Sequence, residues 1–290
     1  MRARTGSRGL GALLGGVLSL LGALLSDGCI GASEEQIRGS GHLVQETREV
    51  ASFASVAFMT SGDLEIEVSD REALLIEAED NLLDCIETEV VDGQLTIRHR
   101  GNLAPAPTKR LSFHLQVREL SGVIFACEGT VSLPHLKTDR LEIRHSGSGA
   151  IDMGVLETDI LVIHSSGSGI VSCKRVNARR CRLLASGSGE TEIGKLEGLA
   201  NDVRLTGSGE IRILRGSVVE QEVFVSGSGE FSAEGLRSTQ SEVMVSGCGG
   251  ATVHAEGLLD ATITGSGDIR YGGRPYLHIS DTGSGKLRRI

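Results

Sequence analysis

A serine between two glycines recurs along the second half of the chain, and this triplet could support several kinds of chemistry. The first copies stand in HSGSGAID (residues 145–152) and HSSGSGIV (residues 164–171), and related triplets continue to residue 285. Backbone amides of a glycine-rich turn can cradle a phosphate, and acidic residues beside such a turn can bind calcium. The same triplet also serves as a flexible linker or as a tight structural corner.

The residues around the triplets do not favour a phosphate cradle. A dinucleotide fingerprint needs a third glycine where GSGETEIG (residues 187–194) has Glu192, and no helical pattern follows it. The triplet that begins at Gly283 lacks both the upstream glycine and the Ser or Thr of a P-loop. We therefore expect no nucleotide and no other cofactor.

Calcium is a stronger alternative, because Glu190, Glu210 and Glu230 follow the triplet in three successive units. Stacked in register at about 5 Å, their charges repel one another unless a cation or an arginine lies between them. Only half of the units have an acidic residue here, whereas calcium-binding β-helices repeat an aspartate at every turn. We expect a solvated outer face without a metal site, and a weak calcium site is the alternative.

Carboxylates and basic residues of the kind that glycosidases and lyases use are present, but they do not cluster in the sequence. The candidates by residue type are Asp139 with Arg140, Glu157 with Asp159, and Asp202 with Arg204. They change from unit to unit, so surface ion pairs explain them more simply. His145 and His164 lie nearest to a corner but lack a paired metal spacing, and no G-x-S-x-G motif occurs. We expect no catalytic residue.

The glycines recur with a fixed period, which predicts the architecture. The closing glycine of the triplet repeats every 20 residues from Gly149 to Gly249, and every 18 residues from there to Gly285. A corner repeated in every unit needs either a positive φ or a close backbone approach at the same place. Cys248 replaces the serine in one unit, so the backbone requirement is stricter than the serine chemistry. The expected corner glycines are Gly147, Gly149, Gly167, Gly169, Gly187, Gly189, Gly207, Gly209, Gly227, Gly229, Gly247, Gly249, Gly265, Gly267, Gly283 and Gly285.

Apolar residues keep the same register between the glycines and alternate with polar ones, which indicates short strands. Such a unit buries its apolar face only when it is stacked on a copy of itself. We therefore predict an all-β fold, a right-handed parallel β-helix of about 20-residue rungs, over residues 123–290. The column two residues after each closing glycine holds Val131, Ile151, Val171, Thr191, Ile211, Phe231 and Ala251. The column six residues before it holds Val123, Ile143, Ile163, Leu183, Val203, Val223 and Val243.

Residues 42–122 are also β-rich but less regular. We predict a short turn around Asn81 to Asp84, a hairpin at Asp92–Gly93, and a loop from Asn102 in the proline-containing segment NLAPAPTK. These elements are expected to continue the stack as wider, irregular rungs and to cap its end.

The N-terminus has the pattern of an export signal. Residues 1–28 combine a basic start with an apolar run, and Cys29 follows directly, as in bacterial lipoproteins whose cysteine is lipidated. Cleavage after Ala32 is the alternative. We predict a lipid anchor at Cys29, a tether over residues 29–41, and an outer-membrane or cell-surface location.

The net charge limits the possible partners, and the cysteine spacing limits the possible disulfides. The formal net charge of −9 argues against a nucleic-acid partner, since phosphate binding needs a basic face. No two cysteines lie about 20 residues apart, the spacing that would stack them in neighbouring rungs. We expect mostly free, buried thiols at the remaining cysteines, which are Cys85, Cys127, Cys173, Cys181 and Cys248.

Several longer stretches together resemble a known family, the putative auto-transporter adhesin, head GIN domain family of bacterial envelope proteins. They are GSGHLVQETREVASFASVAFMTSGDLEIEV, LLIEAEDNLLDCIETEVVDGQLTIR and the later SGSG and GSGDI repeats, from about Gly39 to Gly285. The resemblance implies an exported β-helical head GIN domain with a surface or adhesive role and no catalytic residues to transfer. We therefore expect a non-enzymatic adhesin or surface binding protein with an unknown protein or glycan ligand. The alternatives are a carbohydrate-active β-helix enzyme and a structural or sensory envelope module.

Overall fold

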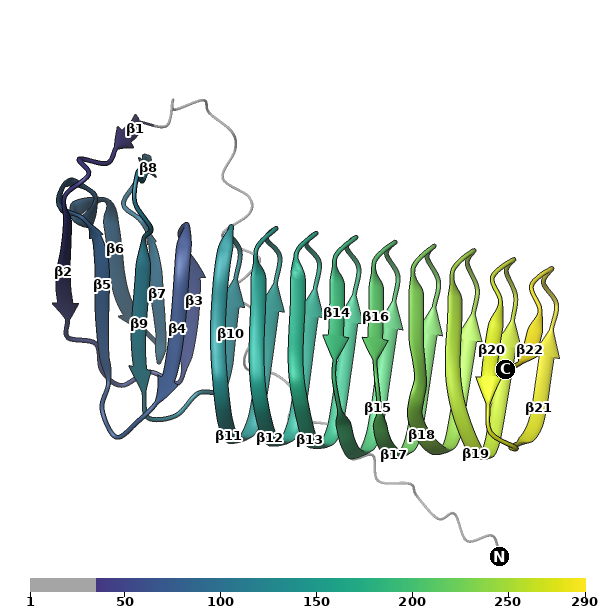
Figure 1. The fold of residues 1–290 in the computed structure, drawn as a ribbon. Helices are drawn as coiled ribbons and strands as arrows, with labels where there is room; N and C mark the ends of the chain where they lie inside the picture. Colours follow the sequence, from purple (N-terminus) through teal and green to yellow (C-terminus); the bar gives the residue numbers. More distant parts are fainter. Residues whose placement is uncertain (1–34) are drawn as a thin grey trace, which may run out of the picture. The chain divides into compact units, whose positions relative to one another are not determined.

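The computed structural model describes residues 35–290, which form a single stack of β-strands (Figure 1). In the regular part, each coil runs along one sheet, bends, returns along a second sheet, and turns at a Gly-Ser-Gly corner into the next coil. The strands of this part are β10 (Gly122–Phe125), β11 (Gly129–His145), β12 (Ala150–Ser165), β13 (Ile170–Ala185), β14 (Glu190–Ile193), β15 (Leu196–Leu205), β16 (Glu210–Ile213), β17 (Gly216–Val225), β18 (Glu230–Val245), β19 (Gly250–Ile263), β20 (Ile269–Gly272), β21 (Tyr276–Asp281) and β22 (Leu287–Arg289).

Neighbouring coils pair in parallel with the register that the repeat predicts. Val131 pairs with Ile151 and Ile151 with Val171, a shift of one whole unit at each step. Between β18 and β19 the register shifts in the bend, and Ala251 then pairs with Ile269. The change from 20-residue to 18-residue units is therefore absorbed in the bend, while the corners stay aligned.

The two predicted apolar columns both point into the stack. The side chains of the column from Val131 to Ala251 are all at most 3% exposed, and those of the column from Val123 to Val243 are at most 2% exposed. Each unit thus buries its apolar face against the next one, which is the stabilising principle of a solenoid. The predicted parallel β-solenoid is confirmed.

The corner glycines are required by close backbone approach rather than by a positive φ. A Cβ on Gly167 would lie 2.0 Å from the carbonyl oxygen of Gly147, and one on Gly187 would lie 2.0 Å from that of Gly167. The amides of Ser168 and Gly169 both donate to the Gly147 carbonyl, at 3.2 and 3.3 Å. Consecutive corners therefore hydrogen-bond to one another at a distance that leaves no room for a side chain.

The N-terminal part continues the parallel stack, since β7 pairs in parallel with β3 and β9 with β4, and antiparallel strands then replace the predicted wider rungs. Strands β3 and β4 pair in parallel with β10 and β11, but the β2–β5, β5–β9 and β6–β7 pairs are antiparallel. This antiparallel end closes over the first coil and serves as the expected cap. Its elements are β1 (Glu35–Arg38), β2 (Leu43–Arg48), β3 (Ser55–Met59), β4 (Gly62–Val68), β5 (Ala73–Glu79), a 3-10 helix (Asp80–Cys85), β6 (Ile86–Val91), β7 (Gln94–His99), β8 (Leu103–Ala106) and β9 (Ser112–Val117).

Two local predictions in this part have different outcomes. The Asp92–Gly93 hairpin is confirmed, since both residues have a positive φ, of 50° and 75°, between antiparallel β6 and β7. The predicted loop from Asn102 is wrong, because β8 within it pairs in parallel with β1. Pro105 is tolerated there because this two-stranded sheet has only edge strands. Residues 35–38, predicted as part of the tether, form β1.

Candidate functional site

The stacked glutamates, for which a weak calcium site was the alternative, form ion pairs with arginines. The β14, β16 and β18 registers stack Glu190, Glu210 and Glu230 directly on one another. The guanidinium of Arg212 lies 2.6 Å from Glu190 and 2.9 Å from Glu210, and Arg270 lies 3.5 Å from Glu230. Arginine therefore supplies the positive charge that the stacked carboxylates need. Within residues 35–290, no three His, Cys, Asp or Glu side chains gather into a group that could hold a metal ion.

The acidic and basic residues that the sequence offered as catalytic candidates form separate pairs on different coils. Asp202 lies 2.9 Å from Arg182 and 3.6 Å from Arg204. Glu157 lies 3.8 Å from Lys137. Arg182 and Lys137 reach their partners from neighbouring strands, whereas Arg204 and the largely buried Asp202 lie on one strand. Pairs of this kind stabilise the stack modestly.

The remaining candidates, Arg140 and the two histidines, have different surroundings. Arg140 lies 3.5 Å from Glu142, on its own strand. His164 lies 3.8 Å from the same carboxylate on the outer face, whereas His145 is buried and stacks on Phe125 with 5.5 Å between ring centroids. Two of the sequence candidates line hollows: Asp159 lines one at the bends, and Asp202 lines a smaller one beside it.

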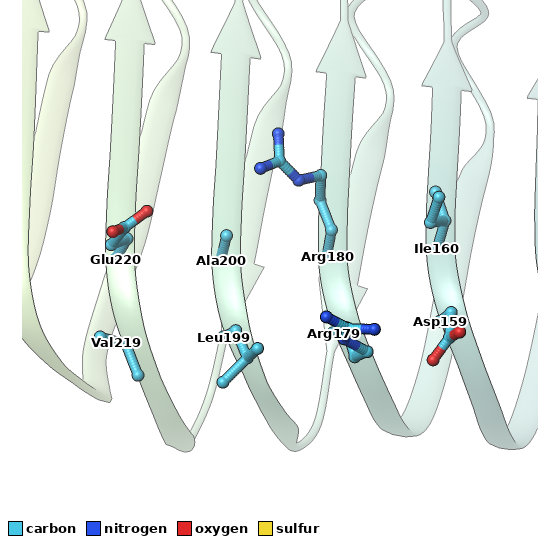
Figure 2. Close-up of a pocket in the computed structure, with 8 residues that line it drawn as sticks. All are labelled: Asp159, Ile160, Arg179, Arg180, Leu199, Ala200, Val219 and Glu220. Atoms are coloured by element: carbon cyan, nitrogen blue, oxygen red, sulfur yellow. The ribbon is translucent and has the colours of Figure 1, made fainter.

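The hollow that Asp159 lines has a volume of about 550 Å³ and lies on the outer surface where four successive coils bend. Figure 2 shows two rows of side chains, one residue of each row from every coil. The lining residues are Asp159, Ile160, Arg179, Arg180, Leu199, Ala200, Val219 and Glu220, from strands β12, β13, β15 and β17. We call this hollow the bend groove.

The bend groove exists because a short side chain interrupts a column of long ones. Ile160, Arg180, Ala200 and Glu220 occupy equivalent positions in successive coils. The methyl group of Ala200 leaves space between Arg180 on one side and Glu220 on the other, as Figure 2 shows. The second row contributes Leu199 and Val219, which are 50% and 45% exposed. These two side chains form a small exposed aliphatic pair in a row whose other members in the groove, Asp159 and Arg179, are charged.

A second hollow of about 300 Å³ shares Arg180, Ala200 and Glu220 with the bend groove. It extends over the outer column of β15, β17, β18 and β19, whose carboxylates are stacked by the strand register. The carboxylate residues of this second hollow, besides Glu220, are Asp202, Glu222, Glu242 and Asp260. On the β13 side of Ala200 the surface therefore has Arg179 and Arg180 with Asp159 one coil further, and on the other side it has mainly carboxylates.

Sequence reasoning identified only Asp159 among the residues of the bend groove. The available signal was the outer column that reads Asp159, Arg179, Leu199, Val219 at the repeat spacing, where charge gives way to aliphatic residues. That signal is weak in the sequence alone, because the bend between the two sheets carries no glycine or proline common to all units.

The cysteines agree with the expectation of thiols rather than cross-links. No disulfide joins the cysteines of residues 35–290, and Cys85, Cys173 and Cys181 are buried. Burial raises the pKa of the Cys173 thiol to about 12. The predicted export signal and the predicted lipidation at Cys29 lie outside the described residues. Over the described part of the chain, no helix is both long and apolar enough to span a bilayer.

Parallel coils, a cap of antiparallel strands and an exposed hollow at the bends define this protein as a capped β-solenoid. The model of one family, described as putative auto-transporter adhesin, head GIN domain, matches residues 52–174 and 155–275. The chain belongs to that family. Among proteins with curated descriptions, none matches this sequence.

Solved structures share the fold. A putative adhesin from Parabacteroides merdae has a TM-score of 0.71 at 21% identity, with 88% of this chain and 99% of that chain covered. A putative lipid binding protein from Parabacteroides distasonis has a TM-score of 0.70 at 26% identity, with 88% and 100% covered. A putative adhesin from the same organism has a TM-score of 0.66 at 24% identity, with 88% and 100% covered.

Proposed function

We propose that this chain is a non-enzymatic binding protein of the bacterial cell envelope that mediates attachment to a surface. The observation that carries the proposal is the contrast between the two sides of the strands. Inward positions are almost all apolar in every coil, whereas outward positions change between charged, polar and aliphatic residues from coil to coil. A stack of this kind is a rigid scaffold for an extended binding surface. Membership of a family described as putative adhesins supports the same proposal.

Attachment is tested in the organism that encodes the chain. Cells that lack the gene should attach less to host-derived or abiotic surfaces than the parent strain, and a plasmid copy should restore attachment. The purified protein, coated on beads, should confer attachment on beads that otherwise do not adhere. Unchanged attachment after deletion, together with inert beads, would contradict the proposal.

The membrane anchor is part of the proposal and has its own test. We propose that Cys29 is lipidated after cleavage of residues 1–28, so that the described stack is held at the membrane surface. Cells grown with labelled palmitate should incorporate label into the protein, and the Cys29→Ala variant should remain unlabelled. Equal labelling of both proteins would disprove lipidation at this residue.

A further inference from the structure

The bend groove contains two guanidinium groups that form no ion pair with any described residue, although the carboxylates of Asp159 and Glu220 also line it. Within residues 35–290, neither Arg179 nor Arg180 has an ion-pair partner within 4.0 Å, although other arginines on the outer faces, such as Arg182 and Arg212, do. Asp159, one coil earlier in the same row as Arg179, is not close enough to form one. Both side chains are exposed, and Figure 2 shows the Arg180 guanidinium directed away from Arg179 and toward the coil of Ala200, so the donors of each guanidinium remain available to an anion.

The apolar part of the groove begins directly beside this pair. Leu199 and Ala200 lie one coil further along the stack, and Val219 lies two coils further, about 10 Å away at the usual strand spacing. Figure 2 shows the Arg180 side chain leaning toward the coil of Ala200, so the charged end borders the aliphatic track. A ligand lying along the groove would therefore meet charge first and aliphatic side chains next.

The composition of the groove selects among anionic ligands. No aromatic side chain lines it, so the flat face of a sugar ring has no stacking partner there. Exposed Leu199 and Val219 instead offer contact to an alkyl chain, whose burial is favourable in proportion to the apolar area removed from water. The volume of about 550 Å³ lies in the range of small-molecule sites.

We propose that the bend groove binds a monomeric amphiphile with one anionic head group, a phosphate or a carboxylate, and an aliphatic tail. Arg180, whose guanidinium borders Ala200, binds the head group, Arg179 adds a second positive charge to the groove, and the tail lies over Ala200 beside Leu199 and Val219. The carboxylates beyond Ala200, from Glu220 onward, repel an anion and so fix the direction of the ligand. This assignment goes beyond attachment and holds whether or not the chain mediates it.

The test measures binding of decyl phosphate to the purified protein by isothermal titration calorimetry, below the concentration at which the amphiphile aggregates. We expect saturable binding of one molecule per chain. Inorganic phosphate, which has the head group alone, should bind at least tenfold more weakly. Decyltrimethylammonium, which has the tail with a cationic head, should also bind at least tenfold more weakly. Equal binding of either comparison compound would overturn the proposal.

Two double variants locate the site. Arg179→Gln with Arg180→Gln should weaken decyl phosphate binding at least tenfold, because the groove loses the Arg180 donors and both of its positive charges. Leu199→Ser with Val219→Thr should weaken decyl phosphate binding several-fold while leaving the weak binding of inorganic phosphate unchanged. These side chains are exposed, so both variants should melt within a few degrees of the parent. Unchanged decyl phosphate binding in both variants would disprove the location.

The matched control removes two positive charges from the same strand at positions outside the groove. Lys174→Gln with Arg175→Gln changes two exposed basic residues of β13 that do not line the groove, and affinity should stay within twofold. A tenfold loss in this control would mean that net charge, not the groove, governs binding. A competition experiment tests other classes of ligand. If a galacturonate oligomer or an acidic peptide displaces the bound amphiphile at a lower concentration than unlabelled decyl phosphate does, the amphiphile assignment is wrong.

Discussion

The guanidinium of Arg212 lies 2.6 Å from the carboxylate of Glu190, which belongs to the preceding coil. The same guanidinium lies 2.9 Å from Glu210, which the strand register stacks directly on Glu190. Like charges placed opposite each other on neighbouring strands destabilise a sheet. The positive charge of Arg212 therefore offsets the repulsion between the carboxylates of two adjacent coils at this outer position.

Replacing Arg212 should expose this repulsion. Arg212→Gln is expected to lower the free energy of unfolding by about 1 kcal/mol, and by more at low ionic strength, where charges are less screened. Urea unfolding at two salt concentrations measures both effects. The additional change Glu210→Gln should recover part of the loss because it removes one of the two repelling charges. A loss that is independent of salt would contradict the electrostatic explanation.

The corner glycines make a steric prediction. A Cβ on Gly167 would lie 2.0 Å from the Gly147 carbonyl oxygen, so Gly167→Ala forces two consecutive corners apart. We expect a loss of about 2 kcal/mol of unfolding free energy, the usual cost of overpacking. Ser168→Ala is the matched control, since the Ser168 side chain is exposed and only its amide contributes to the corner. The control should change stability by less than about 0.5 kcal/mol. Similar losses in both variants, measured by thermal unfolding, would refute the close-approach explanation.

The regular half of the fold is predictable from sequence because one physical requirement recurs in every unit. Each inward residue must be apolar like the residue one unit away, so the columns that contain Ile151 and Ile163 are recognisable in the sequence without a structure. The N-terminal part has no such constraint. Whether a strand there pairs in parallel or antiparallel depends on contacts between distant segments, as in β5 with both β2 and β9. Short-range patterns found the Asp92–Gly93 hairpin and missed the β1–β8 pair.

The candidate site is less predictable for a related reason. A hollow on a solenoid forms where an outward side chain is shorter than its neighbours in space, as Ala200 is between Arg180 and Glu220. Those neighbours are a whole unit away in sequence, and outward positions follow no common rule. The pairing of Arg212 with two carboxylates depends on the direction of a long side chain, which the repeat leaves open. The sequence predicts the position of such residues on the outer face but not which of them meet.

Thiol reactivity should follow burial in the stack. Cys248 is exposed, while Cys173 and Cys181 are buried, and burial raises the pKa of both buried thiols. Because the thiolate is the reactive form, iodoacetamide at neutral pH should modify Cys248 readily and the buried pair only after unfolding. Peptide-level mass spectrometry distinguishes the sites. Modification of Cys173 in the folded protein at the rate of Cys248 would contradict the packing of the inward column.

Glu79 connects two loops to β5 by hydrogen bonds, and its ionisation should make the free energy of unfolding depend on pH. Its buried carboxylate accepts hydrogen bonds from the Thr108 hydroxyl and from the amides of Thr108, Gly41 and Lys109. The Thr108 hydroxyl is the strongest influence, and these bonds together hold the pKa of Glu79 below its usual 4.5 despite burial. Since the folded pKa is depressed, the stabilisation is complete above pH 4.5 and is lost as the pH falls toward the folded pKa.

Glu79→Gln should therefore destabilise the protein at neutral pH and flatten the decline of stability below pH 4.5. Urea unfolding between pH 3 and pH 7 compares the slopes of variant and parent. Glu77→Gln is the matched control on the same strand, because the Glu77 side chain makes a surface hydrogen bond, 2.8 Å from Gln45. If Glu77→Gln flattens the pH dependence of stability as much as Glu79→Gln does, the loss of any negative charge causes the effect, and the buried carboxylate does not.

His145 extends an aromatic column in the core. Its ring stacks on Phe125 at 5.5 Å, and Phe125 stacks on Phe58 at 6.0 Å. Burial lowers the pKa of His145 below its usual 6.5, because the charged ring is disfavoured inside the stack. The unfolded chain therefore takes up the proton first as the pH falls. Stability should decline from about pH 6.5 downward until the lower, folded pKa is reached.

His145→Phe removes this titration and continues the stack with a third phenylalanine. Between pH 6.5 and pH 5, the parent protein should lose stability faster than the variant, by up to about 1.4 kcal/mol per pH unit. Melting temperatures across that range provide the comparison. His135→Gln, which removes an exposed ring on β11, is the control for the loss of a histidine at the surface. If parent and His145→Phe decline in parallel, the buried ring does not titrate on unfolding, and the acid sensitivity must come from groups on the outer faces.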